Sequence, residues 1–262
     1  MEPAGLTVGV LALAGLFSNA IQCFEFVQLG RNFGKSFQIN QLKLDNARLR
    51  LSRWGNAIGL SNDLQGARSL EERFGSQNVG HARSLLEQIL GLFAEAESVS
   101  GKYKSRSEPH DGQLETFDPR VDLEPTVADL HNKMTELAAS RQNKTGFRQR
   151  AKWALFEEKT SRRLIEDITD LIDGLVKLFR ASQETQRELC DTELSSISTK
   201  ENIQVLGDIA EEQDKFLKDA IAKATSKDDG VHNIVFSGND NAGFQMGHNS
   251  GTISGLTFGR KD

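Results

Sequence analysis

Apolar residues recur at intervals of three and four along most of the chain, from about Leu6 to Ala224. This spacing gathers apolar side chains on one face of a helix, so it predicts amphipathic helices packed around a shared core. We therefore expect an all-α bundle, with a last helix from Asn202 to Ala224. The apolar stripes consist of Leu42, Leu49, Trp54 and Ile58; of Leu85, Leu86, Ile89, Leu92 and Phe93; of Leu164, Ile165, Ile168, Leu171, Ile172, Leu175, Leu178 and Phe179; and of Ile203, Leu206, Ile209, Phe216 and Leu217.

Prolines mark the breaks between these helices. Pro109 and Pro119 lie in the polar segment SEPHDGQLETFDP, which we expect to form a loop. Pro125 suits the first turn of a helix, where its missing N–H would have no partner in any case.

The pattern changes near residue 226. From Val231 to Gly259 the only formal charge is that of Asp240, and Gly, Asn, Ser and Thr replace helix formers. Such a segment cannot bury enough apolar surface to fold alone. We expect two parts: a helical bundle over residues 1–225 and a disordered Gly/Asn-rich tail over residues 226–262.

The first predicted helix differs from the others because the stretch from Leu6 to Phe24 has no charged residue. A helix of about 20 residues is about 30 Å long, which matches the hydrocarbon core of a bilayer. Polar residues in its second half weaken that hypothesis, and a buried core helix is the alternative. A third possibility is a helix that leaves the bundle only on a signal. The candidate membrane-inserting residues are Leu6, Gly9, Val10, Leu13, Leu16, Phe17, Ile21 and Phe24.

Composition narrows the classes of function. With 262 residues and a net charge of −5, the chain lacks the basic surface that nucleic-acid binding requires. Only two cysteines, Cys23 and Cys190, and a start without a basic segment indicate a protein that is cytoplasmic at rest.

Signatures of catalysis are absent from the sequence. No P-loop, dinucleotide fingerprint or nucleophile elbow occurs. The histidines lack the spacing of metal ligands, and the acidic and basic pairs fit solvated helix faces. We expect no enzyme, no cofactor and no metal. The histidines are His81, His110, His131, His232 and His248.

A near-palindrome, NAGFQMGHN, stands at Asn241–Asn249 in the tail. In an extended strand, alternate side chains fall on opposite faces, so amides and glycines would share one face and apolar residues the other. Identical strands stacked in register at about 4.8 Å would form amide ladders. The pattern therefore fits a self-templating amyloid strand, and it fits a flexible tail equally well. A flexible tail and a Ca²⁺-binding glycine-rich repeat are alternatives, although the repeat would need more aspartates than Asp240.

Several blocks of the chain resemble a known family. AGLFSNAIQCFEFVQLGRNFG (residues 14–34), LRLSRWG (49–55) and WALFEEKTSRRLIEDITDLIDGLVKLF (153–179) look like the HeLo domain of fungal heterokaryon-incompatibility proteins. The resemblance covers most of residues 1 to about 222. It implies an all-helical bundle whose N-terminal segment targets membranes as a toxin.

The tail resembles a motif that occurs in fungal cell-death proteins related to this family. It lacks the two repeats of the het-s prion domain but matches the Asn-x-Gly-x-Gln-x-Gly-x-Asn motif of fungal cell-death effectors. That motif is similar to the RHIM amyloid core of animal necroptosis kinases. The implied amyloid residues are Asn241, Gly243, Phe244, Gln245, Met246, Gly247 and Asn249.

Together the two resemblances imply one mechanism. A NOD-like receptor with a matching motif would template the tail into an amyloid, and the stacked bundles would release their N-terminal helices into the plasma membrane. The implied partners are further copies of the chain, the receptor and membrane lipids. Two alternatives stay open: a non-toxic inhibitor that co-assembles with a toxic relative, and a prion adaptor without pore activity.

Overall fold

The structure, a computed structural model, describes residues 4–29, 35–61, 70–106, 118–142, 152–155, 157–197 and 199–228. The candidate amyloid motif at 241–249 and most of the predicted loop at 107–119 lie outside these residues. One compact unit extends to Ile221, and a second begins at Ala222. Of that second unit the structure describes only residues 222–228, so the predicted boundary at 226 stays a prediction.

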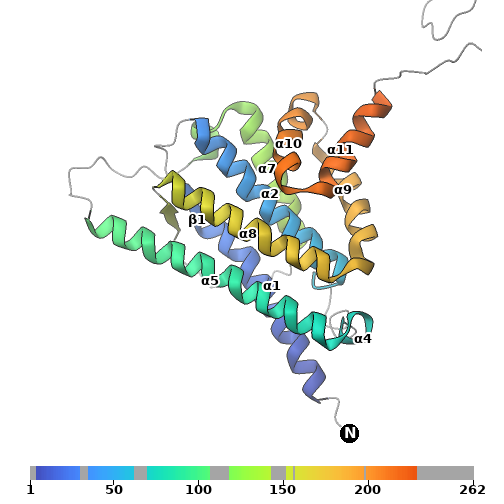
Figure 1. The fold of residues 1–262 in the computed structure, drawn as a ribbon. Helices are drawn as coiled ribbons and strands as arrows, with labels where there is room; N and C mark the ends of the chain where they lie inside the picture. Colours follow the sequence, from blue (N-terminus) through green and yellow to red (C-terminus); the bar gives the residue numbers. More distant parts are fainter. Residues whose placement is uncertain are drawn as a thin grey trace, which may run out of the picture. The chain divides into compact units, whose positions relative to one another are not determined.

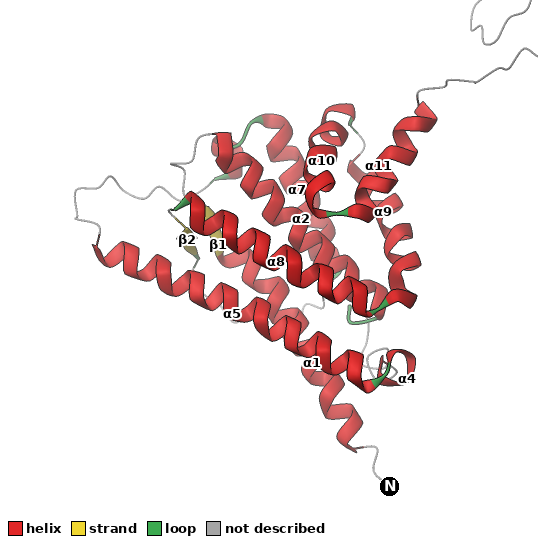
Figure 2. Ribbon diagram, in the orientation of Figure 1, coloured by secondary structure: helices red, strands yellow, loops and turns green. Residues whose placement is uncertain are grey.

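The described chain is almost entirely helical, which confirms the all-α prediction (Figures 1 and 2). Proline begins two of the helices, Pro119 in α6 and Pro125 in the first turn of α7. The helices are α1 (Ala4–Phe26), α2 (Lys35–Ile58), α4 (Leu70–Phe74), α5 (Ser76–Arg106), α6 (Pro119–Asp122), α7 (Pro125–Ser140), α8 (Glu158–Leu178), the 3₁₀ turn η2 (Arg180–Ser182), α9 (Gln183–Ile197), α10 (Lys200–Gln213) and α11 (Lys215–Asp228).

Two short strands, which the periodicity did not predict, pair in parallel. β1 (Val27–Leu29) follows α1 directly, and β2 (Trp153–Leu155) precedes α8. Val27 lies opposite Trp153 and Leu29 opposite Leu155. The hydroxyl of Ser100 in α5 donates a hydrogen bond of 2.6 Å to the carbonyl of Ala154. The pair thus ties the end of α1 to the start of α8, beside α5.

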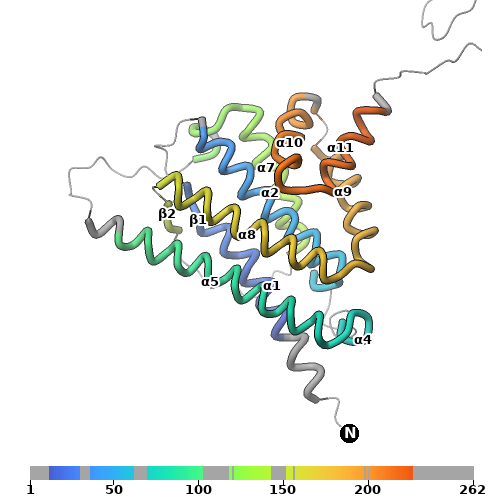
Figure 3. Tube along the Cα trace, in the orientation of Figure 1, coloured from blue at the N-terminus to red at the C-terminus, as the bar shows by residue number. Residues whose placement is uncertain are grey.

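Helix α2 lies at the centre of the bundle, in contact with α1, α7, α8, α9 and α10. Helices α5 and α8 run side by side, and α5 also packs against α1 (Figure 3). Every residue from 44 to 55 is buried. The sequence predicted an amphipathic helix here, with an apolar stripe from Leu42 to Ile58. The stripe is buried as predicted, but so are the polar residues between positions 44 and 55 on the other faces of α2.

The predicted last helix is wrong in one respect, because it is two helices. Asp214 separates α10 from α11 with non-helical dihedrals, φ −142° and ψ 87°. Its carboxylate accepts a hydrogen bond from the backbone N–H of Leu217 at 3.2 Å, which satisfies one of the free donors at the start of α11. We refer to Asp214 as the α10–α11 joint.

Candidate functional site

The structure describes the side chains of α1 from Ala12 onwards, and most of the apolar ones among them are buried in the bundle. Leu13 and Ile21 are fully buried, Phe17 is 2% exposed and Phe24 6%. Leu16 is half-buried, and the side chains of Leu6, Gly9 and Val10 lie outside the described part. The rings of Phe24 and Phe93 in α5 meet edge to face, with centroids 4.9 Å apart. In the resting structure these residues of α1 therefore act as core.

No helix among the described residues is both long and apolar enough to cross a membrane.

Helices α1 and α2 pack tightly at Gly55. A Cβ atom there would lie within 3.0 Å of three atoms of the Phe17 ring, so only glycine leaves room for that ring. Phe17 also meets Trp54 at 6.1 Å between centroids, and Trp54 meets Phe179 at 5.7 Å. Phe179 in turn lies 4.8 Å from Phe74. A row of edge-to-face rings thus joins α1, α2, the end of α8 and α4.

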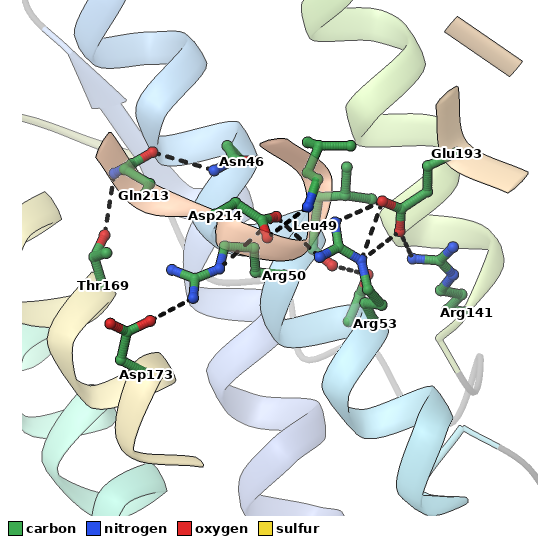
Figure 4. Close-up of polar contacts among 12 residues, drawn as sticks. Asn46, Leu49, Arg50, Arg53, Arg141, Thr169, Asp173, Glu193, Gln213 and Asp214 are labelled. Carbon is green, nitrogen blue, oxygen red and sulfur yellow. Dashed lines mark hydrogen bonds and ion pairs between the residues drawn. The ribbon is translucent and has the colours of Figure 1, made fainter. Parts of the chain in front are cut away.

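The opposite side of the same turn of α2 carries a buried guanidinium. The Nε and Nη2 of Arg53 donate to the two carboxylate oxygens of Glu193 in α9, with Nε at 3.0 and 3.1 Å and Nη2 at 2.5 Å. The Nη1 of Arg53 donates to Oδ2 of Asp214 at 2.9 Å. Arg141, at the end of α7, donates to Glu193 at 2.5 Å (Figure 4).

One helical turn earlier, Arg50 extends this group. Its Nη2 donates to Asp173 in α8 at 2.5 Å, and its Nε lies 3.8 Å from Asp214. Among the described residues, its Nη1 has no hydrogen-bond partner. Gln213 bridges α2 and α8, since it accepts from Asn46 at 3.3 Å and donates to Thr169 at 3.1 Å (Figure 4).

We call these six charged residues the Arg53 cluster. It is balanced, with three positive and three negative side chains, which is how charges are tolerated in a protein interior. Burial lowers the pKa of the Arg53 guanidinium, but the carboxylates of Asp214 and Glu193 outweigh burial and hold that pKa well above its ordinary value. Arg53 is therefore permanently charged. The cluster consists of Arg50, Arg53, Arg141, Asp173, Glu193 and Asp214.

The cluster shows no arrangement for catalysis. Burial raises the pKa of the neighbouring Cys190 thiol, so it stays protonated and is a poor nucleophile. Cys23 and Cys190 are both buried and form no disulfide. In the part of the chain that the structure describes, no three His, Cys, Asp or Glu side chains could hold a metal ion.

A cavity of about 550 Å³ adjoins the cluster. It lies among α8, α9 and the α10–α11 joint, and its lining includes Arg50, Arg53, Asp173, Asp214 and Phe216. The cavity therefore brings solvent-accessible space next to the buried side chains of Arg50, Arg53 and Asp214.

Sequence reasoning found α1 but missed the Arg53 cluster. The apolar stripe took in Leu49 and Trp54 of the segment LRLSRWG but not its arginines, although Arg50 and Arg53 are three apart and therefore share a helix face. Arginines within an otherwise buried helix are a signal for buried ion pairs. Their partners could not be read from the sequence, because Glu193 and Asp214 are 140 and 161 residues away.

Comparison with known proteins gives matches to both parts of the chain. The HeLo family, described as "Prion-inhibition and propagation", matches residues 5–206. A second family, described as "SesB domain on fungal death-pathway protein", matches residues 230–255, which include the near-palindrome at 241–249.

Curated and solved relatives agree with the first match. The chain is 33% identical over 222 residues to heterokaryon incompatibility protein s of Podospora anserina, covering 85% of this chain and 74% of that protein. Protein S of the same species is also 33% identical, over 227 residues. The solved HET-s N-terminal domain aligns with a TM-score of 0.72 and 32% identity, over 82% of this chain and 97% of the domain. A doubly substituted form of that domain aligns with the same TM-score.

Proposed function

The chain belongs to the HeLo family, and we propose that it executes programmed cell death by coupling amyloid assembly of its tail to membrane damage by α1. One observation carries the proposal: the charge-free segment Leu6–Phe24 lies in a helix whose Leu13, Phe17 and Ile21 are buried in the bundle, and the tail of the same chain matches a fungal death-pathway domain. Burial in the core explains the apolar segment by itself, but it does not explain why the same chain carries the matching tail.

The first step is templating of the tail. A NOD-like receptor that carries a matching motif presents an ordered strand, and residues 241–249 add to it with Gln245 stacked on Gln245. Each added strand pairs its backbone with the strand below, which offsets the conformational entropy lost on ordering. Successive additions bring many bundles to one place.

The second step is the release of α1. Full burial of one Leu, Ile or Phe side chain contributes about 1.5–3 kcal/mol, so Leu13, Phe17 and Ile21 hold α1 firmly in the resting bundle. Transfer of these side chains into lipid removes the same apolar surface from water, and so offsets most of that loss. The protein is cytoplasmic at rest and moves to the plasma membrane when activated.

The experiment uses dye-loaded vesicles of phosphatidylcholine, with and without phosphatidylserine. Full-length protein is added with and without preformed fibres of residues 226–262. We expect leakage only in the presence of fibres, together with thioflavin fluorescence and a reflection near 4.8 Å. The matched control is a peptide of residues 226–262 in which the five amide and glycine positions of the segment 241–249 are scrambled, which we expect neither to assemble nor to cause leakage.

Each other outcome has a distinct meaning. Seeded fibres without leakage would contradict execution and support the adaptor, or an inhibitor if the same protein lowers the leakage that a toxic relative causes. A tail that never assembles would contradict the amyloid step.

A further inference from the structure

Three consecutive residues of α2, Arg53, Trp54 and Gly55, hold elements on opposite sides of that helix. Arg53 binds the α10–α11 joint, whereas Trp54 and Gly55 contact Phe17 of α1. We propose that this turn, which we call the coupling turn, transmits displacement of α11 to α1. The inference rests on the proposed function, since it names the contacts through which the tail would release α1.

On the joint side, the contact depends on one carboxylate. Asp214 is 3% exposed, breaks the helix, accepts from the N–H of Leu217 and binds Arg53. Helix α11 carries the tail on its C-terminal end, so a displaced α11 pulls directly on Asp214. The loss of Asp214 leaves Arg53 and Arg141 with Glu193 alone, a buried excess of positive charge that is costly in a protein interior.

The cavity beside the joint allows water to reach this excess positive charge. Arg50 and Arg53 both line it, so water that enters the cavity can hydrate a guanidinium that has lost its carboxylate. The guanidinium of Arg53 then reorients, and the backbone that carries it shifts.

On the α1 side, the side chains are packed without free space, so they cannot adjust locally to such a shift. Trp54 is fully buried between the rings of Phe17 and Phe179, and Phe17 fills the space beside Gly55. Close-packed interiors repack between discrete arrangements instead of deforming smoothly. A small movement of the coupling turn therefore removes the space that Phe17 occupies beside Gly55, and α1 loses one of its contacts with α2.

A second link between α2 and the same region offers a matched control. Lys43 pairs with Glu212, which lies two residues before the joint, but Glu212 is 62% exposed and the pair is remote from Trp54 and Gly55. Removal of this link loosens α10 without disturbing the coupling turn.

The experiment measures the thiol reactivity of Cys23, which is buried in α1. Full-length protein is labelled with a maleimide below the unfolding range of urea, and mass spectrometry quantifies Cys23 and Cys190 separately. We expect Asp214→Asn to accelerate labelling of Cys23 by about tenfold, a typical size for coupling between sites. Glu212→Gln should leave the rate unchanged.

Reciprocity supplies the second measurement. If the coupling turn joins the two sites, Gly55→Ala must loosen α11, which amide hydrogen exchange of residues 215–221 reports. The effects of Asp214→Asn and Gly55→Ala on Cys23 labelling must also be non-additive in the double variant. Met134→Ala, a change in the buried part of α7, controls for general loss of stability.

The result that overturns the inference is faster labelling of Cys190 alone in Asp214→Asn, or additive effects in the double variant. If Asp214→Asn does not fold, Asp214→Glu takes its place, because it keeps the charge but displaces the carboxylate relative to Arg53. Because the assay contains neither lipid nor fibres, its failure leaves the proposed function intact. Conversely, if the vesicle experiment shows no leakage, the coupling between α11 and α1 can still be measured by labelling of Cys23.

Discussion

The ring of Phe17 in α1 occupies the space beside Gly55 of α2 that any larger side chain would need. Phe17 is 2% exposed, so it has no alternative position within the packed core. The absence of a single methyl group on α2 thus determines how deeply α1 sits in the bundle.

Gly55→Ala should therefore destabilise the protein although alanine favours helices. Overpacking of a filled core costs about 1–3 kcal/mol. Urea unfolding of the full-length protein measures this loss. In the control Gly91→Ala, on an open and exposed face of α5, the added Cβ meets nothing within 4 Å, and we expect a gain of up to about 1 kcal/mol. Equal effects of the two substitutions would refute the steric argument.

Glu193→Gln should reduce the free energy of unfolding by about 3–5 kcal/mol, because it breaks a buried ion pair and leaves Arg53 and Arg141 with one carboxylate fewer. The matched control is Glu87→Gln in the exposed Arg83–Glu87 pair, where we expect a change below about 0.5 kcal/mol. Thermal and urea unfolding test both variants. A loss below about 1 kcal/mol in Glu193→Gln would show that the cluster adds specificity without stability.

Stability should depend on pH through His131. Burial lowers the pKa of this imidazole, but Asp45, whose Oδ2 lies 2.6 Å from Nδ1, outweighs burial, so the pKa is raised despite the opposing charge of Arg48. The protonated pair links α7 to α2. Its contribution is fully present below the unfolded pKa of about 6.5 and disappears as pH rises through the higher folded pKa.

NMR titration of the His131 ring and unfolding between pH 5 and pH 8 measure this dependence. His131→Gln should remove the loss of stability above pH 6.5. A titration midpoint at or below the ordinary value in the folded protein would contradict the prediction.

Membrane damage should be separable from folding at Gly15. Leu13→Lys would place a charge in the segment that we propose enters lipid, but Leu13 is fully buried, so the lysine would also disrupt the bundle. Gly15 is exposed and a side chain there meets nothing within 4 Å. We expect Gly15→Lys to keep the bundle and the fibres but abolish leakage, because a central lysine costs about 2.5–3.5 kcal/mol on insertion scales. Gly15→Ala is the matched control, and equal leakage from both would exclude α1 as the lipid-entering element.

Gln245→Pro should abolish seeded assembly, because proline removes a backbone donor from the ladder and restricts φ. Gln245→Asn keeps an amide that can stack and should retain assembly at a reduced rate. Seeded thioflavin kinetics of the two full-length variants distinguish these outcomes. Normal fibres from Gln245→Pro would rule out in-register stacking at this position.

The helices and their apolar stripes were predictable because helix periodicity is a local property of the sequence. Leu42, Leu49, Trp54 and Ile58 lie within a few turns of one another on one face of a helix, and the hydrophobic effect buries that face. The charge-free character of Leu6–Phe24 and the change of composition near residue 226 are likewise properties of consecutive residues. Solvation and backbone preference act over such short distances, so the sequence alone determined them.

Only the tertiary structure determined whether the arginines of α2 are solvated or buried in ion pairs. A guanidinium at residue 53 is compatible with a solvated face until Glu193 and Asp214, 140 and 161 residues further on, enclose it. The break at Asp214, the parallel pairing of β1 with β2 and the seating of Phe17 on Gly55 have the same origin. Each of these features depends on contacts between segments that are far apart in the sequence. Which segments come into contact is determined by the total free energy of packing the whole core, which no local stretch of sequence reveals.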